Sequence, residues 1–198
     1  TESFRQRYRQ SFEASIFGGN RADYKSKVNS LPGVGGTRVY RTALGPSTVG
    51  LTIIDSQFKA PSQTLIDEVQ QAIDPIGEQG EGVGLAPINH IVTVSGVTEV
   101  PINVGLNLTY APGFTFDVVR TQIESTINEY FTSLGQEWAS ATTKQEDDTP
   151  ITVRISQIEF RVLSVEGILD IANTTINGGT GNIALTVTEI PILGTVTG

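Results

Sequence analysis

The sequence predicts an α+β fold in which helices pack on small mixed sheets. Apolar residues recur every three or four positions over residues 116–138, which predicts a long amphipathic helix. Apolar and polar residues alternate strictly over 102–110, which predicts a half-buried antiparallel strand. Gly and Pro residues separate the helical from the extended stretches along the chain. Such a mixture of short strands and helices is typical of the α+β class.

The chain opens with a predicted helix within a linking segment, residues 1–18. Its apolar residues recur every fourth position and would form one face opposite a charged one: Phe4, Tyr8, Phe12 and Ile16. Because the chain starts at Thr1 with no methionine, we expect it to be a piece of a longer protein. The apolar face needs a surface to cover it, so these four residues are the candidate partner contacts.

Residues 19–80 are predicted to form a first α+β subdomain with the order helix, strand, strand, helix. Asn20 is expected to cap its first helix, which ends at Pro32-Gly33. Two extended runs follow around the Gly45-Pro46 turn and predict a hairpin. Thr64 and Asp67 have the spacing of a capping box at the start of the next helix.

A glycine-rich segment, residues 76–87, is expected to be a boundary or a long ordered loop. After it, residues 85–198 are predicted to form a second α+β subdomain. This subdomain would contain two strands, the second over 102–110, and then the long helix over about 116–138 packed across a sheet.

A polar stretch leads from the long helix to a short one. Ser156 and Glu159 are spaced as its capping box, with Ile155 and Phe160 in the positions of a hydrophobic staple. Gly167 is expected to end this helix, and two strands close the chain. Residues 28–34 and 162–168 share a helix end, a glycine and the start of a strand, which leaves open whether the two subdomains are related copies.

Composition removes several classes of function. The 198 residues include no Cys, 21 acidic and 13 basic residues, for a net charge of −8. Disulfide frameworks and thiolate sites are therefore excluded. Since no basic stripe is visible, we expect no nucleic-acid partner. Since no apolar run reaches the roughly 18 residues needed to span a bilayer, we expect no membrane insertion.

Candidate reactive groups are few. The chain has one histidine, His90, expected to be a partly buried strand residue with a hydrogen-bond partner. The glycines at 33–36 lead into a strand, whereas a phosphate-binding loop leads into a helix. The acidic cluster at 146–148 lacks the spacing of a calcium loop and is interpreted as a solvated loop. We therefore assign no catalytic, cofactor-binding or metal-binding residue, and expect no cofactor or small-molecule substrate.

Several segments, taken in order, resemble the baseplate J-like family of contractile phage tails. They are GGNRADYKSKVNSLPGVGGTRVY, GPSTVGLTIID, LIDEVQQAIDPIGEQGEG, GLAPINHIVTVSGVTEVPINVGLNLT, ISQIEFRVLSVEGILDI and EIPILGTVT. Together they cover nearly everything from Gly18 onward. Each is a fold signature without reactive chemistry, so the specificity of the match lies in the shared order of the segments.

The resemblance implies a non-enzymatic wedge subunit in the baseplate of a phage tail or prophage tail-like particle, assembled in the bacterial cytoplasm. Its partners would be other baseplate proteins and neighbouring copies in a ring around the tail hub, in a multiple of six. Two alternatives stay open: a receptor- or glycan-binding tail module and a tail-associated hydrolase. No functional residues carry over, because the family is defined by its architecture.

Overall fold

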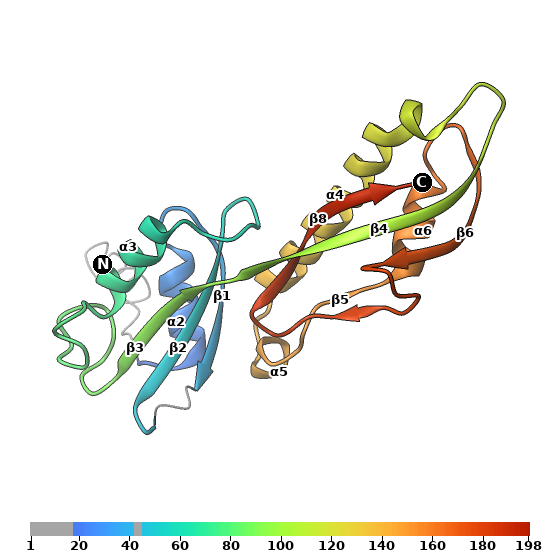
Figure 1. Ribbon diagram of the computed structural model, residues 1–198. Helices are drawn as coiled ribbons and strands as arrows, with labels where there is room; N and C mark the ends of the chain where they lie inside the picture. Colours follow the sequence, from blue (N-terminus) through green and yellow to red (C-terminus); the bar gives the residue numbers. More distant parts are fainter. Residues whose placement is uncertain (1–17, 42–44) are drawn as a thin grey trace, which may run out of the picture.

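The computed structural model describes residues 18–41 and 45–198, which form two α+β units arranged end to end (Figure 1). The predicted α+β class is confirmed. The described elements, in chain order, are α2 (Arg21–Asn29), β1 (Val34–Arg41), β2 (Thr48–Asp55), α3 (Gln63–Ile73), β3 (Ile91–Gly96), β4 (Thr98–Tyr110), α4 (Phe116–Ala139), α5 (Lys144–Asp147), β5 (Thr152–Val153), α6 (Ile155–Val162), β6 (Ile168–Ile176), β7 (Ile183–Ala184) and β8 (Glu189–Thr197).

The first unit is a three-stranded sheet of order β1-β2-β3, covered on one face by α2 and α3. β1 and β2 form the predicted antiparallel hairpin, and α3 carries the chain across to β3, which runs parallel to β2. Asn20 caps α2 as predicted, since its side chain accepts a hydrogen bond from the Asp23 N–H. The buried apolar side chains of the two helices and of one sheet face form one core: Tyr24, Val28, Val39, Leu51, Ile53, Val69, Ile73, Ala86, Val92 and Val94.

The glycine-rich segment is a loop inside the first unit. It joins α3 to β3, and β3 pairs with β2, so the strand expected in the second subdomain belongs to the first sheet. The chain passes between the sheets at Val97 instead of at residues 80–85. The pattern of glycines marked an ordered loop correctly, but it carried no information on which strand β3 would join.

Both edges of the first sheet are covered by side chains. On β3, the Val92 N–H donates to Asp74 Oδ2 (2.8 Å) and the Val94 N–H donates to Gln70 Oε1 (2.8 Å). On β1, the Val39 carbonyl accepts from Arg21. These side chains occupy backbone groups that an added strand would otherwise pair with.

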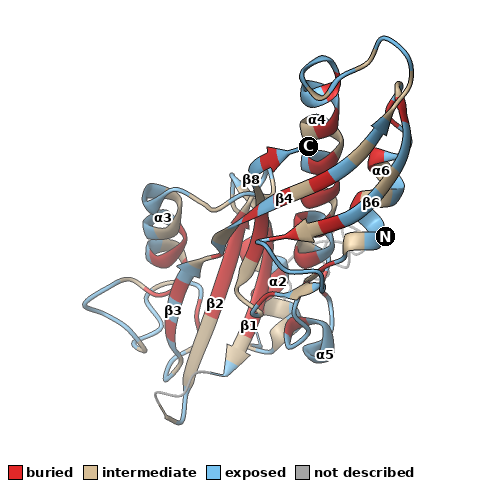
Figure 2. Cartoon of the chain, turned by 45° about the vertical axis from the view of Figure 1, so that its right-hand side comes forward, coloured by how far each residue is buried: buried red, intermediate tan, exposed pale blue. Residues whose placement is uncertain are grey.

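The second unit is built around α4, which lies across a sheet of order β6-β4-β8 (Figure 2). β4 is antiparallel to β6 and parallel to β8. The predicted alternation along β4 is confirmed, because Ile102, Val104 and Leu106 are all buried in the core that α4 covers. The predicted long helix is confirmed as well, and its buried face consists of Val119, Ile123, Ile127, Tyr130, Phe131, Leu134, Gly135 and Trp138.

Two predicted capping boxes are wrong. α3 begins one residue after Ser62, whose hydroxyl accepts from the Leu65 N–H (3.2 Å), so Thr64 lies inside the helix. α6 begins at Ile155, and its N-cap Arg154 makes no side-chain capping bond. Phe160 is 73% exposed and forms no staple. Spacing alone cannot tell which of several nearby hydroxyl residues adopts the extended backbone of an N-cap.

The repeated helix–glycine–strand pattern exists in both units. Gly33 between α2 and β1 has φ +85°, and Gly167 between α6 and β6 has φ +92°. Both positions need the left-handed backbone that glycine adopts without strain. Among the described residues, no helix combines the length and apolar character required to cross a membrane.

Candidate functional site

The most distinctive chemistry of the described chain lies where the two units meet. There α5 and the end of α4, both from the second unit, lie against β1 and α2 of the first unit. The residues involved are charged and yet buried, which is rare unless the charges are paired.

Asp147 of α5 is the centre of the junction. Its side chain is fully buried, and it accepts hydrogen bonds from two cations of α2. Lys25 Nζ donates to Asp147 Oδ1 at 2.6 Å, and Arg21 Nη1 donates to Asp147 Oδ2 at 3.0 Å. Lys25 Nζ also donates to the Ala141 carbonyl at 2.6 Å. The ammonium group of Lys25 therefore joins α2 to two segments of the second unit.

Arg38 of β1 crosses the same junction and is only 2% exposed. Its Nε donates to the Trp138 carbonyl (3.2 Å) and its Nη1 donates to the Thr149 carbonyl (2.8 Å). The guanidinium carbon lies 4.8 Å from the centroid of the Trp138 ring, a cation–π distance. Burial lowers the pKa of Arg38 from its ordinary value, partly offset by Tyr40 and Asp147. The guanidinium stays charged, because its ordinary pKa lies so far above neutrality.

The helix that carries Asp147 is held by a capping box. Thr143 accepts from the Glu146 N–H, and the Glu146 carboxylate accepts from the Thr142 and Thr143 N–H groups at 2.6 and 2.9 Å. These backbone donors lower the pKa of Glu146 to about 2. The interpretation of 146–148 as a solvated loop is therefore wrong, because a one-turn helix turns Asp147 inward while Glu146 caps it.

Glu146 gives a prediction about acid stability. Its folded pKa of about 2 lies below the ordinary value of 4.5, so its stabilising effect is complete above about pH 4.5 and is lost as the pH falls toward 2. We expect Glu146→Gln to lower the midpoint of thermal unfolding at pH 7, and this difference from wild type to shrink between pH 4.5 and 2. Thermal scans of Glu146→Gln and of an Asp148→Asn control check it. A difference that is the same at both ends of this range would contradict it.

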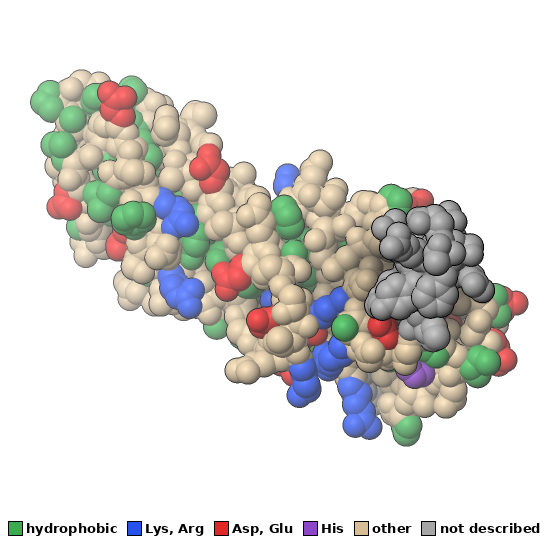
Figure 3. All heavy atoms as spheres, turned by 180° about the vertical axis from the view of Figure 1, so that it is seen from behind, with side chains coloured by type: hydrophobic (Ala, Val, Ile, Leu, Met, Phe, Trp, Pro, Cys, Tyr) green, Lys and Arg blue, Asp and Glu red, His purple; other side chains and the backbone are tan. Residues whose placement is uncertain are grey.

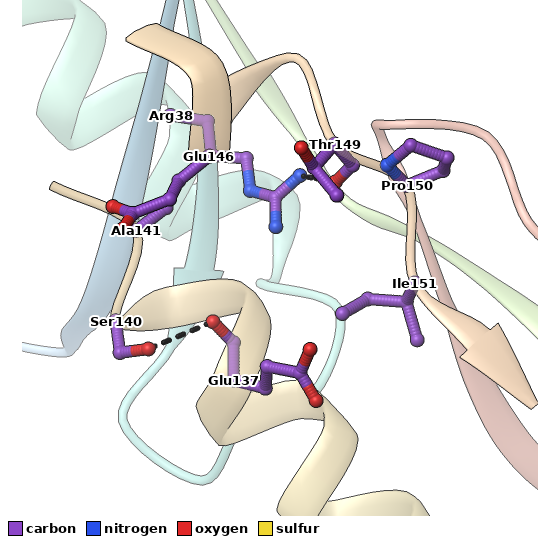
Figure 4. Close-up of a pocket in the computed structure, with 8 residues that line it drawn as sticks. All are labelled: Arg38, Glu137, Ser140, Ala141, Glu146, Thr149, Pro150 and Ile151. Carbon is purple, nitrogen blue, oxygen red and sulfur yellow. Dashed lines mark hydrogen bonds between the residues drawn. The ribbon is translucent and has the colours of Figure 1, made fainter. Parts of the chain in front are cut away.

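A shallow pocket of about 260 Å³ opens beside the junction (Figure 4). The Arg38 guanidinium points into it toward Thr149, and Glu137 and Glu146 line it as well. Arg38 and Glu146 are already bonded to the protein's own backbone groups. The hydroxyls that line it donate to backbone carbonyls as well, Ser140 to Glu137 and Thr149 to Gln145. The arrangement therefore fixes α5 and α4 against β1.

The remaining sequence candidates lie elsewhere. His90 comes directly before β3 and not within a strand, but the predicted hydrogen-bond partner is present: Tyr24 Oη is 2.9 Å from His90 Nδ1. Gly33 leads into β1, as expected of a turn. The candidate partner contacts lie outside the described residues: Phe4, Tyr8, Phe12 and Ile16. Within residues 18–41 and 45–198, no group of three or more His, Asp or Glu side chains is placed to hold a metal ion.

Sequence reasoning missed the junction itself. Lys25 and Arg38 carry no local signal of burial, since each stands among residues that also fit an exposed position. One local signal did exist: Thr143 and Glu146 have the S/T-x-x-E spacing of a capping box, which predicts a helix start inside the polar stretch.

Comparison with known protein families assigns both units. Residues 16–96 match the baseplate J-like central domain, and residues 102–198 match the baseplate J-like protein C-terminal domain. The chain belongs to the baseplate J-like family. The gap between the two matched ranges contains Val97, where the chain leaves β3 and enters β4, so the family domains coincide with the two units of the structure.

Two proteins of Bacillus subtilis (strain 168) resemble this baseplate J-like chain over 195 residues, 98% of its length. Phage-like element PBSX protein XkdT is 28% identical and the uncharacterized protein YqbT is 30% identical. The chain spans 52% of each, about half the length of the curated relatives it matches.

A chain in the cryo-EM structure of the anti-feeding prophage (AFP) baseplate, 6-fold symmetrised, has a similar fold. The TM-score is 0.59 at 11% sequence identity, and the match covers 98% of this chain and 41% of that chain. At this identity the likeness concerns the fold alone. It extends over both baseplate J-like domains together.

Proposed function

We propose that this chain is a structural subunit of the baseplate of a contractile phage tail or prophage tail-like particle, a wedge component assembled around the tail hub. The observation that carries the proposal is that both units belong to the baseplate J-like family and are fixed to each other by buried charges. A wedge needs a defined angle between its parts. Directional hydrogen bonds fix such an angle here, and they are made by Lys25, Arg38 and Asp147.

The proposed role is non-enzymatic and is performed by surfaces. The buried charges of the junction are bonded to one another or to backbone groups, which suits structure better than turnover. The proposed partners are other baseplate proteins and neighbouring copies in a ring whose multiplicity is a multiple of six. The proposed location is the tail baseplate, after assembly in the bacterial cytoplasm.

The test is deletion of the gene that encodes the chain in the producing strain. We expect no complete contractile particles by electron microscopy, and restoration of particles by the wild-type gene. Particles that form, contract and fail to adsorb would support the receptor-binding alternative. Intact, infective particles would refute both.

The same strain tests the proposed partner-contact helix. A gene with Phe4, Tyr8 and Phe12 changed to Ser should restore few or no particles, because the apolar face would be lost. A matched gene with Gln6 and Gln10 changed to Ser should restore them fully, since the predicted helix would place these residues off that face. Equal restoration by both genes would refute the contact role.

A further inference from the structure

A long stretch of the chain that runs through the first unit carries acidic residues and no basic ones. Between Lys59 and Arg120 the sequence contains no Lys or Arg. The acidic residues in this stretch are Asp67, Glu68, Asp74, Glu78, Glu81, Glu99 and Asp117. Four of them are exposed on α3 or on the loop that follows it: Asp67, Glu68, Glu78 and Glu81. No Lys or Arg of this stretch balances them, so α3 and the loop after it present a negative field.

The loop between α3 and β3 also exposes apolar side chains beside these acids. Ile76, Val83 and Ile88 are 70%, 60% and 76% exposed. Together with Glu78 and Glu81 we call them the acidic loop surface. Monomeric proteins rarely gather exposed large apolar residues in one loop, and such clusters mark interaction sites.

This loop is held in place by its own hydrogen bonds. The Gly80 N–H donates to the buried Asp74 carboxylate (3.0 Å), and the Asn89 N–H donates to the Gly80 carbonyl (2.7 Å). The Glu81 N–H donates to the Glu78 carbonyl (3.1 Å). The surface is therefore formed before any partner arrives, which lowers the entropic cost of binding.

The opposite edge of the same sheet is basic. Residues 18–41 carry five basic residues against one acidic residue, Asp23: Arg21, Lys25, Lys27, Arg38 and Arg41. Arg21 and Lys25 both bind the buried carboxylate of Asp147, and Arg38 donates to the Asp147 backbone carbonyl beside it, so the positive charge of the three is incompletely balanced. Figure 3 shows Lys and Arg side chains gathered near the middle of this face, with acidic side chains at the outer end of the first unit.

A concavity of about 180 Å³ lies on this basic edge. We call it the arginine pocket, after four of its lining residues: Arg21, Tyr40, Arg41 and Val49. Arg41 is exposed and forms no ion pair with any residue among 18–41 and 45–198. Arg and Tyr are, with Trp, the residue types enriched among the side chains that dominate binding energy.

We propose that the arginine pocket of one copy receives the acidic loop surface of a second copy. The two surfaces match in kind: exposed Glu, Ile and Val on the loop, and Arg, Tyr and the half-buried Val49 in the pocket. Both lie at the same end of one sheet, where Arg41 ends the edge strand β1 and the loop leads into the edge strand β3, so the contact joins neighbouring but different patches of two identical chains. Such a head-to-tail contact generates a ring when the rotation closes.

This inference rests on the proposed function, because a ring of neighbouring copies is what the contact would build. The side chains that cover the edges of β1 and β3 favour a contact between side chains over the addition of a strand. The opposite charges would also steer the two copies toward the correct orientation.

The absence of cysteine from the chain permits a direct test. We would complement the deletion strain with genes carrying Val49→Cys, Val83→Cys or both, and treat purified particles with a short bis-maleimide cross-linker. Val49 lies in the arginine pocket and Val83 in the acidic loop surface. The double variant should give dimers and higher multimers of this chain on a denaturing gel, and each single variant should give only monomers.

Charge reversal provides the second arm. In the two-cysteine background, Arg41→Glu should reduce the multimers about tenfold, and adding Glu81→Lys to the same chain should restore them, because both sides of every contact are then reversed. Glu129→Lys, on the exposed face of α4, is the matched control and should change nothing.

The outcomes separate the two proposals. Intact particles in which the two-cysteine chain stays monomeric would overturn the contact while leaving the baseplate role standing. A product of Val83→Cys with a different protein would likewise overturn it, by assigning the loop to another partner. Particles that contain no copy of the chain would refute the proposed function itself.

Discussion

Replacing Asp147 by Asn should lower the free energy of unfolding by about 3–5 kcal/mol. The carboxylate is fully buried and is the charge partner of Lys25 and Arg21. Removing its charge leaves these cations and the neighbouring Arg38 without their shared counter-charge in a buried junction. Urea unfolding followed by the fluorescence of Trp138, the single tryptophan, measures this loss of stability with a probe that lies at the junction.

Asp148→Asn is the matched control, one residue away. Asp148 is exposed and, among the described residues, forms an ion pair only with the exposed Lys144, so its loss should cost at most about 1 kcal/mol. The double variant Lys25→Met/Asp147→Asn should be less destabilised than the sum of the two single changes, because it removes both members of the pair. Equal stability of Asp147→Asn and Asp148→Asn would show that the junction charges do not hold the two units together.

Ile127→Asp should lower the free energy of unfolding by several kcal/mol. This is a large part of the total free energy of unfolding of a typical domain, about 5–15 kcal/mol. Ile127 lies in the middle of the buried face of α4 and is 0% exposed. A carboxylate there would be buried in a cluster of hydrophobic side chains, where an unpaired charge is costly. Circular dichroism during urea unfolding measures the change.

The matched control is Val118→Asp on the same helix, where the side chain is 64% exposed. Since no charge is buried there, we expect its stability to stay within about 0.5 kcal/mol of wild type. If Ile127→Asp unfolded at the same urea concentration as Val118→Asp, α4 would not present its apolar face to the sheet.

Elements with a strong local pattern could be predicted from the sequence. α4 and β4 could be predicted because hydrophobic periodicity depends only on residues close together in the chain. The β1–β2 hairpin was predictable for the same reason, since its two strands flank one short turn. Asn20 was recognised as an N-cap from its place directly before a helical pattern.

Features that depend on distant residues could not be predicted. β3 pairs with β2 as a parallel strand, although α3 and its loop separate the two in the chain. The residues of β3 do not indicate which strand it pairs with. The junction pairs are farther apart still: Lys25 meets Asp147 across 122 positions, and Arg38 meets the Thr149 carbonyl across 111. A buried Lys and an exposed Lys look the same in a single sequence until their partners are known.

The passage between the two sheets has a mechanical consequence. Val97 alone separates β3 from β4, it is 4% exposed, and its N–H donates to the Ile53 carbonyl of the first sheet (3.0 Å). The next residue, Thr98, donates its N–H to the Thr188 carbonyl of the second unit (2.9 Å). Successive residues are thus anchored to different units, so the connection contains no slack. A force applied to one unit would pass directly to the other through extended backbone. A flexible linker between the units would extend first and would not transmit this force.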